Sequence, residues 1–72
     1  MIILSEIQDK ISQAIKQSGM SQTEIATKVG VRQQQISCYL NKQKTPNLDT
    51  FANLCNVLDL DPAEILCLNN LI

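Results

Sequence analysis

Apolar side chains recur along this chain at the spacing of amphipathic helices, and no segment shows the alternation typical of a strand. The first helical segment is expected at residues 5–18, with Ser5 and Gln8 forming a capping box at its start. Gly19 is expected to end it. The apolar stripe of this segment consists of Ile7, Ile11, Ala14 and Ile15. This pattern predicts a scaffold helix that packs on one face.

Two further helical segments follow, with a very short connection between them. The first begins after Ser21, which can cap the helix, and Glu24 is placed to complete a capping box. It ends at Gly30, a residue type that adopts the left-handed conformation without a side-chain clash. The next segment is expected at residues 33–40. Two helices joined by about three residues around a glycine have the geometry of a helix-turn-helix, which we place at residues 21–40.

A polar loop that ends at Pro46 separates these elements from a fourth helical segment. Proline disfavours helical backbone at the residue before it, so this helix is expected to start afterwards, with Asn47 as its cap. We expect it to face the core. Its apolar residues at helical spacing are Leu48, Phe51, Ala52, Leu54, Cys55 and Leu58.

The fifth helical segment is expected to start at Asp61 as its cap, with Pro62 at the first helical position and Glu64 completing another capping box. No linker or repeat separates the segments. The pattern therefore predicts an all-α fold, a compact five-helix bundle that contains the helix-turn-helix, in a single domain of residues 1–72. In that domain, the C-terminal helices at 47–68 supply part of the core and are available as a dimer interface.

The length and the composition limit what this chain can do. With 44% hydrophobic and 18% charged residues, it has the composition of an ordinary soluble domain. A domain of this size buries only about 60% of the surface that its unfolded chain exposes, which leaves little room for an enzyme cleft. The chain contains no histidine, and no cysteine-based or phosphate-cradling motif supplies catalytic groups instead. We expect no enzymatic activity and no small-molecule ligand.

The cysteines Cys38, Cys55 and Cys67 are expected to be reduced thiols. Their odd number and wide spacing give neither a disulfide framework nor a CxxC half-site, and there is no histidine to complete a zinc site. We therefore expect no metal and no cofactor. Cys55 and Cys67, like Tyr39, are expected in the core. The start of the chain lacks the basic region and the long apolar run of a secretory signal, which favours a cytoplasmic protein without a membrane segment.

The net charge of −1 conceals an uneven distribution of charge along the chain. Residues 25–48 contain bases and no acid, whereas residues 49–72 contain acids and no base. The bases are Lys28, Arg32, Lys42 and Lys44, and the acids are Asp49, Asp59, Asp61 and Glu64. This asymmetry is expected if one face of the protein meets a polyanion, although chance clustering in so short a chain gives the same pattern.

A family resemblance extends over nearly the whole chain, in the stretch SQTEIATKVGVRQQQISCYLNKQKTPNLDTFANLCNVLDLDPAEIL. This stretch is similar to the lambda-repressor-like helix-turn-helix domains of the phage repressor and Cro class, the Xre/Cro/C1-type regulators. The matching residues are Gln22, Ala26, Gly30, Ile36, Asn41, Lys44 and Pro46, together with the leucine-rich fourth helix. The resemblance implies a transcriptional regulator that binds double-stranded DNA sequence-specifically, with the helix at 33–40 in the major groove.

The resemblance also implies which residues read the bases. Gln33 and Gln34, at the first two positions of this recognition helix, would point into the groove, with Ser37 and Cys38 one turn later on the same side. A glutamine amide can bind N6 and N7 of adenine in a bidentate manner. Gln35 is expected near phosphate or solvent, because a rotation of about 100° per residue turns it away from that face. The alternative is that the glutamines form only a solvated helix face.

Contacts to the DNA backbone are expected to set the register of the protein on the duplex. Gln22, at the positive N-terminus of the second helix, is the expected phosphate anchor. Its expected companions are Ser21, Gln35, Asn41, Lys42 and Lys44. Each of them could instead be an ordinary cap or loop residue, and Ser21 can hold both roles at once.

The chain departs from the family pattern at three positions. Arg32 replaces the serine or threonine that usually precedes the recognition helix, and arginine is a poor cap that opposes the helix dipole. A nearby phosphate would reverse that preference, so we hypothesise that Arg32 contacts the DNA backbone. Lys42 and Asp59 stand where the family has glycine, and we expect left-handed backbone at both.

We expect no effector domain, so the resemblance implies a regulator that acts by occupying its operator, most simply a repressor. One recognition helix buries too little surface for tight specific binding, so we expect a homodimer on a palindromic operator. The apolar ends MIIL and LCLNNLI could pair across the dimer axis or cover the base of the bundle. Such a protein would be cytoplasmic, and associated with the nucleoid when bound to DNA.

Two other functions are compatible with the sequence. Small proteins of this family also serve as antitoxins or as phage and plasmid regulators. Alternatively, the acidic C-terminal half or the apolar ends bind a protein partner, and the helix-turn-helix no longer reads DNA. The role of Cys38 also has alternatives. Its thiol could contact a thymine methyl group or act as a redox switch, or Cys38 could be only a small, tolerated residue.

Overall fold

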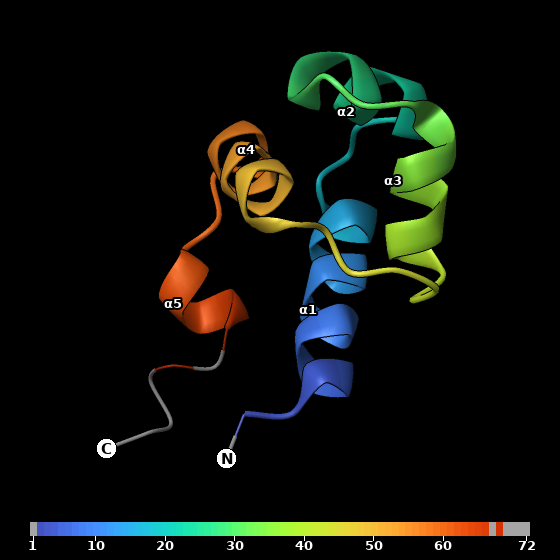
Figure 1. The fold of residues 1–72 in the computed structure, drawn as a ribbon. Coiled ribbons are helices and arrows are strands. Elements are labelled where there is room, and N and C mark those ends of the chain that lie inside the picture. The colour runs from blue at the N-terminus through green and yellow to red at the C-terminus, as the bar shows by residue number, and fades with distance from the viewer. Residues whose placement is uncertain (1, 67, 69–72) are drawn as a thin grey trace.

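The computed structural model describes residues 2–66 and 68, which form five helices and no strand (Figure 1). The helices are α1 (Leu4–Gln17), α2 (Gln22–Val29), α3 (Gln33–Leu40), α4 (Leu48–Leu58) and α5 (Pro62–Ile65). The all-α, five-helix prediction is confirmed. No helix in the described part of the chain has both the length and the apolar character needed to cross a bilayer.

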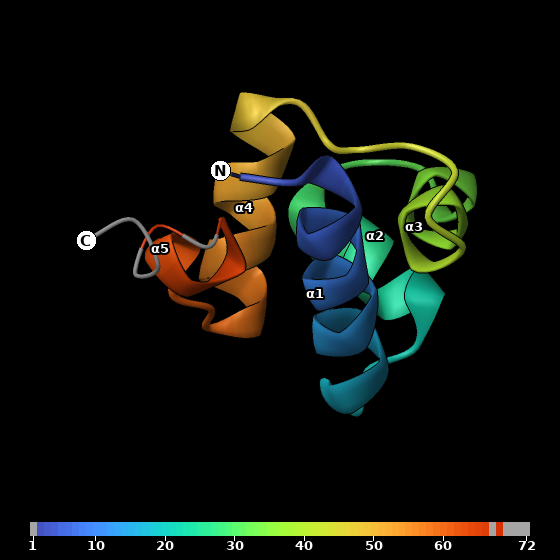
Figure 2. The ribbon, with the colours of Figure 1, turned by 90° about the horizontal axis from the view of Figure 1, so that it is seen from below.

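Helix α1 lies at the centre of the bundle. It packs against α3 on one side and α5 on the other, while α2 packs against α3 and α4. Figure 2 shows α3 on one side of α1 and α4 and α5 on the other, with α2 crossing behind α1 in this view. Helix α2 thus connects α3 with α4.

The core is built from the inward faces of all five helices. Ile25 of α2, Ile36 of α3 and Leu54 of α4 are almost completely buried. The other buried apolar residues are Ile7, Ile11, Ile15, Ala26, Val29, Tyr39, Phe51, Cys55 and Ile65. The predictions that Tyr39 and Cys55 lie in the core are confirmed, and Cys67 lies outside the described residues.

The predicted capping box at the start of α1 is wrong. The helix begins at Leu4, so Ser5 lies inside its first turn, and the cap position is held by Ile3, whose side chain makes no capping bond. The side chain of Gln8 donates to Thr45 Oγ1 at 3.1 Å instead. A long-range partner thus replaces the local one that the sequence pattern suggested.

The expectation that all apolar residues of α4 face the core is also wrong. Leu48 is 86% exposed, and Ala52 is exposed as well. Leu48 is the first helical residue and lies one turn before Phe51, so the start of α4 extends beyond the end of the core. Asn47 occupies the cap position as predicted, but its side chain makes no capping bond, and Asp49 Oδ1 accepts from the Thr50 N–H at 3.0 Å.

The two other predicted capping boxes are half formed. Ser21 Oγ accepts from the Glu24 N–H at 3.1 Å, whereas the Glu24 carboxylate lies 3.6 Å from Lys28 Nζ. Asp61 Oδ1 accepts from the Ala63 N–H at 3.0 Å, with Pro62 at the first helical position. In each case the N-cap side chain satisfies a backbone donor that the helix leaves unpaired.

Four helices are followed by a residue with left-handed backbone. Gly19, with φ of 76°, follows α1, Gly30, with φ of 88°, follows α2, Lys42, with φ of 63°, follows α3, and Asp59, with φ of 55°, follows α4. After the last three, the next residue donates its N–H back across the last turn, as Leu60 does to the Cys55 carbonyl at 2.8 Å. This is the Schellman ending, which satisfies carbonyls at a helix C-terminus. The predicted left-handed conformation of Lys42 and Asp59 is confirmed.

We expect Asp59→Gly to stabilise the fold by about 1 kcal/mol, because a side chain at positive φ crowds the backbone and glycine removes that crowding. Urea denaturation followed by circular dichroism would measure the gain. A matched control is Ala52→Gly at an exposed position inside α4, which should cost about 1 kcal/mol. A loss of stability in Asp59→Gly would contradict the expected effect.

Candidate nucleic-acid interface

Helix α3 is divided along its length into an inward and an outward face. Ile36 and Tyr39 point into the core, whereas Gln33, Gln34 and Gln35 are exposed. The other two residues predicted to read bases, Ser37 and Cys38, are partly buried. The tight turn after α2 fixes this orientation, because Gly30 and Val31 both donate their N–H groups to the Ala26 carbonyl. All four predicted base-reading side chains therefore lie outside the core.

A hollow of about 330 Å³ lies beside the outward face of α3. Its lining residues are Arg32, Gln34, Gln35, Cys38 and Lys44. The fold thus brings two of the predicted base readers together with three of the predicted backbone-contacting residues, while Gln33 and Ser37 do not line this hollow. A water molecule occupies about 30 Å³ in the liquid, so the hollow has room for a polar group of DNA with its bridging waters.

Gln35 lies differently from the expectation that it turns away from Gln34. Its side chain folds back to the start of α3, where Oε1 accepts from the Arg32 N–H at 3.3 Å. This bond is half of a capping box, and the other half is missing because an arginine side chain has no acceptor. The same side chain, with its oxygen engaged in this bond, also lines the hollow.

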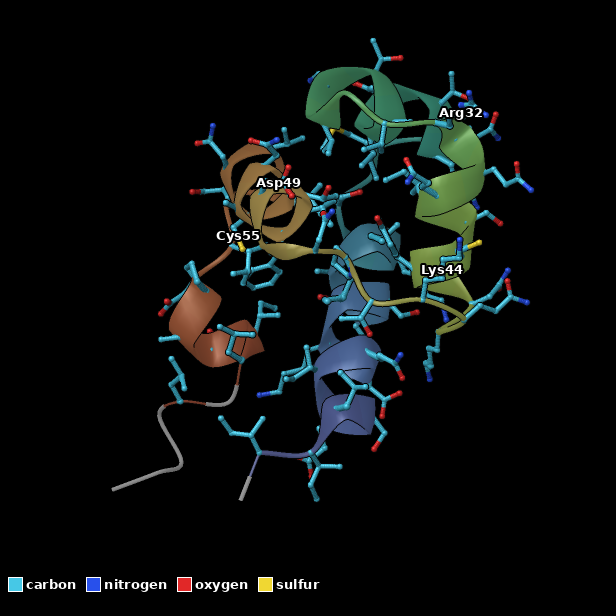
Figure 3. The ribbon with its side chains drawn as sticks, in the orientation of Figure 1. Arg32, Lys44, Asp49 and Cys55 are labelled. Carbon is cyan, nitrogen blue, oxygen red and sulfur yellow. The ribbon has the colours of Figure 1, made fainter. Side chains whose placement is uncertain are left out.

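The positive charges around α3 are not equally available. Lys28 lies 3.6 Å from the Glu24 carboxylate, and Lys42 Nζ lies 2.6 Å from Asp9 Oδ1. Arg32 and Lys44 form no ion pair with any residue that the structure describes. Figure 3 shows Arg32 beside the start of α3 and Lys44 beside its other end, both well separated from Asp49 on α4. Of the four bases near α3, the two without an ion pair to a described residue both line the hollow.

The remaining predicted backbone-contacting residues lie at helix ends. Ser21 caps α2, and Gln22 is its first helical residue, where backbone N–H groups point outward. Asn41 is exposed at the end of α3. Helix N-termini favour anions, so Ser21 and Gln22 stand where a phosphate can be bound.

The sequence pattern missed a set of polar contacts from α1. Ser12 lies between the core residues Ile11 and Ile15 and is only 1% exposed. Its Oγ donates to the Leu40 carbonyl at 2.7 Å. A serine within the buried face of an amphipathic helix was the available signal, because buried hydroxyls require a hydrogen-bond partner. The identity of that partner could not be read from the pattern.

The other reactive groups are held inside the fold. Burial raises the pKa of the Tyr39 phenol, with further contributions from Cys38 and Asp49. Burial likewise raises the pKa of the Cys55 thiol, with a smaller effect from Asp61. Both groups are therefore neutral at physiological pH. A neutral, buried phenol fits the predicted role of Tyr39 as a core anchor rather than a residue that stacks on bases.

The opposite side of α1 carries a second hollow, of about 380 Å³, between α1 and the α4–α5 segment. Charged residues of both signs line it, including Lys10, Asp59 and Asp61, and Lys10 Nζ donates to the Glu64 carbonyl at 3.0 Å. Among residues 2–66 and 68, no three His, Cys, Asp or Glu side chains lie close enough to hold a metal ion.

Comparison with known proteins gives one match. A family model described as helix-turn-helix matches residues 11–65, a range that contains α2 to α5 and the second half of α1. The match includes the hollow and the residues around it. Searches of curated proteins and of solved structures gave no significant match.

Proposed function

Because this chain belongs to the Cro/C1-type helix-turn-helix family of DNA-binding regulators, we propose that it is a repressor that binds a palindromic operator as a homodimer. Helix α3 enters the major groove, as the second helix of such motifs does. The observation that carries the proposal is the hollow beside α3, where amide side chains stand between two unpaired cations, Arg32 and Lys44.

In this proposal the bases are read by Gln33, Gln34, Ser37 and Cys38. Their position outside the core supports the assignment, since a base-reading side chain has to reach the edges of base pairs in the groove. Each glutamine offers a donor and an acceptor to adenine. Cys38 stands beside Gln34 in the hollow, where a small side chain can approach a thymine methyl group.

The DNA backbone is bound by residues at helix ends and in the α3–α4 loop. These are Ser21, Gln22, Arg32, Gln35, Asn41, Lys42 and Lys44. The exposed position of Gln35 supports its assignment to phosphate, and the position of Gln22 at the start of α2 supports the same role for Gln22. Such contacts set the register of α3 on the duplex, and carry no sequence information themselves.

Dimerisation is proposed through the C-terminal end of the domain, residues 47–68. One eight-residue recognition helix buries too little surface for tight specific binding by itself. Exposed apolar residues supply material for an interface, including Leu68 and the N-terminal Ile2, Ile3 and Leu4. Binding to an operator would place the dimer at the nucleoid.

Selection of bound duplexes from a randomised DNA pool, at near-physiological salt, tests the proposal. We expect enrichment of a palindrome with half-sites about 10 bp apart. Gln34→Ala should weaken binding to the enriched sequence about tenfold and relax the preference at one base pair per half-site. Failure to enrich any sequence would overturn the proposal and favour a protein-interaction module. Enrichment of single half-sites by a monomer would overturn the dimer alone.

We expect Arg32→Ser to weaken operator binding and to reduce the slope of log affinity against log salt by about 0.9, because one phosphate contact is lost. The free protein should at the same time become more stable by about 1 kcal/mol, since serine caps a helix and arginine does not. Salt titrations and urea denaturation measure the two effects. An unchanged salt slope, or tighter binding, would show that Arg32 does not contact the backbone.

A further inference from the structure

One side of α1 is connected to the end of α3 and to the loop that follows it. Three polar residues of α1 make these connections, and their partners come in reverse order along the chain. Ser12 Oγ donates to the Leu40 carbonyl at 2.7 Å, Asp9 Oδ1 lies 2.6 Å from Lys42 Nζ, and Gln8 Nε2 donates to Thr45 Oγ1 at 3.1 Å. The loop thus runs antiparallel to α1 and is attached to it at intervals.

We propose that Gln8, Asp9 and Ser12 form a positioning strip that fixes the α3–α4 loop and so determines where Lys44 meets the DNA backbone. This inference rests on the proposed function. It adds a role for α1, which carries none of the residues assigned to DNA. The strip acts through the loop, so its residues are positioning residues and do not themselves touch DNA.

The loop is held at its start by backbone hydrogen bonds to α3 and at its end by the buried Pro46, with few contacts between. Residues 41–45 are all exposed and lie outside the helices. Lys42 has φ of 63°, a backbone conformation that lysine rarely adopts, and no glycine is present there to make the turn easy. The Gln43 N–H donates to the Cys38 carbonyl at 2.9 Å, which fixes the start of the loop but not Lys44 or Thr45. The hydrogen bond from Gln8 to Thr45 holds the chain at the residue after Lys44.

The two cations of the loop differ in their partners, because Lys42 pairs with an acid of the strip and Lys44 forms no ion pair with a described residue. Asp9 balances Lys42, whose side chain is about half exposed in this pair. Lys44, two residues later, forms no ion pair with a described residue and lines the hollow beside α3. A loop held at Lys42 and at Thr45 presents the Lys44 ammonium at a defined height beside the outward face of α3.

A double-mutant cycle on DNA affinity tests the strip. In the wild-type background, Lys44→Ala should weaken operator binding about tenfold and reduce the salt slope by about 0.9. In a Gln8→Ala, Asp9→Asn background, the same change should cost about twofold or less, because Lys44 is no longer positioned. The two sites are then energetically coupled although they share no contact.

The matched control carries Glu6→Gln and Gln13→Ala on α1. It makes the same two types of substitution and the same change of net charge, at exposed positions with no contact to the loop. There Lys44→Ala should retain its full, about tenfold cost. In an Asp9→Glu background with Gln8 intact, Lys44→Ala should again cost about tenfold, since glutamate keeps the carboxylate.

Amide hydrogen exchange in the free protein gives a measurement that does not depend on DNA. Exchange at residues 41–45 should become at least several-fold faster in the strip variant than in the control, with nearly equal melting temperatures. If Lys44→Ala costs the same in every background, or if loop exchange is unchanged, the strip is overturned while the proposed function stands. If the wild-type protein binds no sequence specifically, both are overturned.

Discussion

Replacing Ile36 with alanine is expected to lower the free energy of unfolding by about 2–5 kcal/mol. Ile36 has no exposed surface and comes from the middle of α3, where it packs in the same core as Ile25 and Leu54. Removing three carbons leaves a cavity that the neighbouring helices can close only partly. A domain of this size has a total stability of the order of 5–15 kcal/mol, so the loss takes away a large part of it.

Urea denaturation, monitored by circular dichroism, measures this effect. Ile36→Val is the graded control and should cost about 0.5–1.5 kcal/mol, because it removes a single methyl group. Gln34→Ala, on the outward face of the same helix, should change stability by less than about 0.5 kcal/mol. A cost below about 1 kcal/mol for Ile36→Ala would mean that α3 is not anchored through this side chain.

Ser12→Ala is expected to destabilise the fold by about 1–3 kcal/mol, more than most exposed substitutions do. Ser12 is 1% exposed, and its hydroxyl donates to the Leu40 carbonyl. This carbonyl lies in the last turn of α3, where a helix supplies no N–H donor. Alanine would leave that carbonyl without its donor in a site where water has poor access.

The same denaturation measurement checks this value, with Ser5→Ala as the matched control. Ser5 is exposed in the first turn of α1, and its replacement should change stability by less than about 0.5 kcal/mol. Hydrogen exchange should also locate the loss, since amides near the C-terminal end of α3 are expected to open more often in Ser12→Ala. Equal stabilities of the two variants would show that the hydrogen bond to Leu40 contributes nothing measurable.

The parts of the fold that local chemistry decides could be predicted from the sequence. The bounds of α3, the cap at Ser21 and the left-handed turn at Gly30 depend on residues within a few positions of each other. The left-handed conformations of Lys42 and Asp59 belong to the same group. Helix ends of this kind are specified by the backbone groups that they must satisfy, whatever the tertiary structure.

The errors occurred where distant parts of the chain decide the outcome. Gln8 bonds to Thr45, 37 residues away, and not to the start of its own helix. Leu48 has the spacing of a core residue, but it is exposed at the start of α4, before the first buried residue of that helix. Spacing reports which side of a helix is apolar, and does not report how far the neighbouring helices extend alongside it.

The candidate site shows the same division. The outward position of Gln34 follows from helical rotation once Ile36 is placed in the core, whereas Gln33 lies three residues before Ile36 and its exposure could not be read from that spacing. The pairing of Lys42 with Asp9 could not be anticipated, because it needs the path of the loop over α1. That pairing also explains why a count of bases along the sequence overstates the positive charge available at the interface.

The two faces of α3 have a consequence for how such proteins diversify. Ile36 and Tyr39 hold the helix in place, while the side chains on the other face make no contribution to the core. Under the proposed function, a gene copy can change several of these outward residues without losing the ability to fold, and each change is then a trial of a new target sequence.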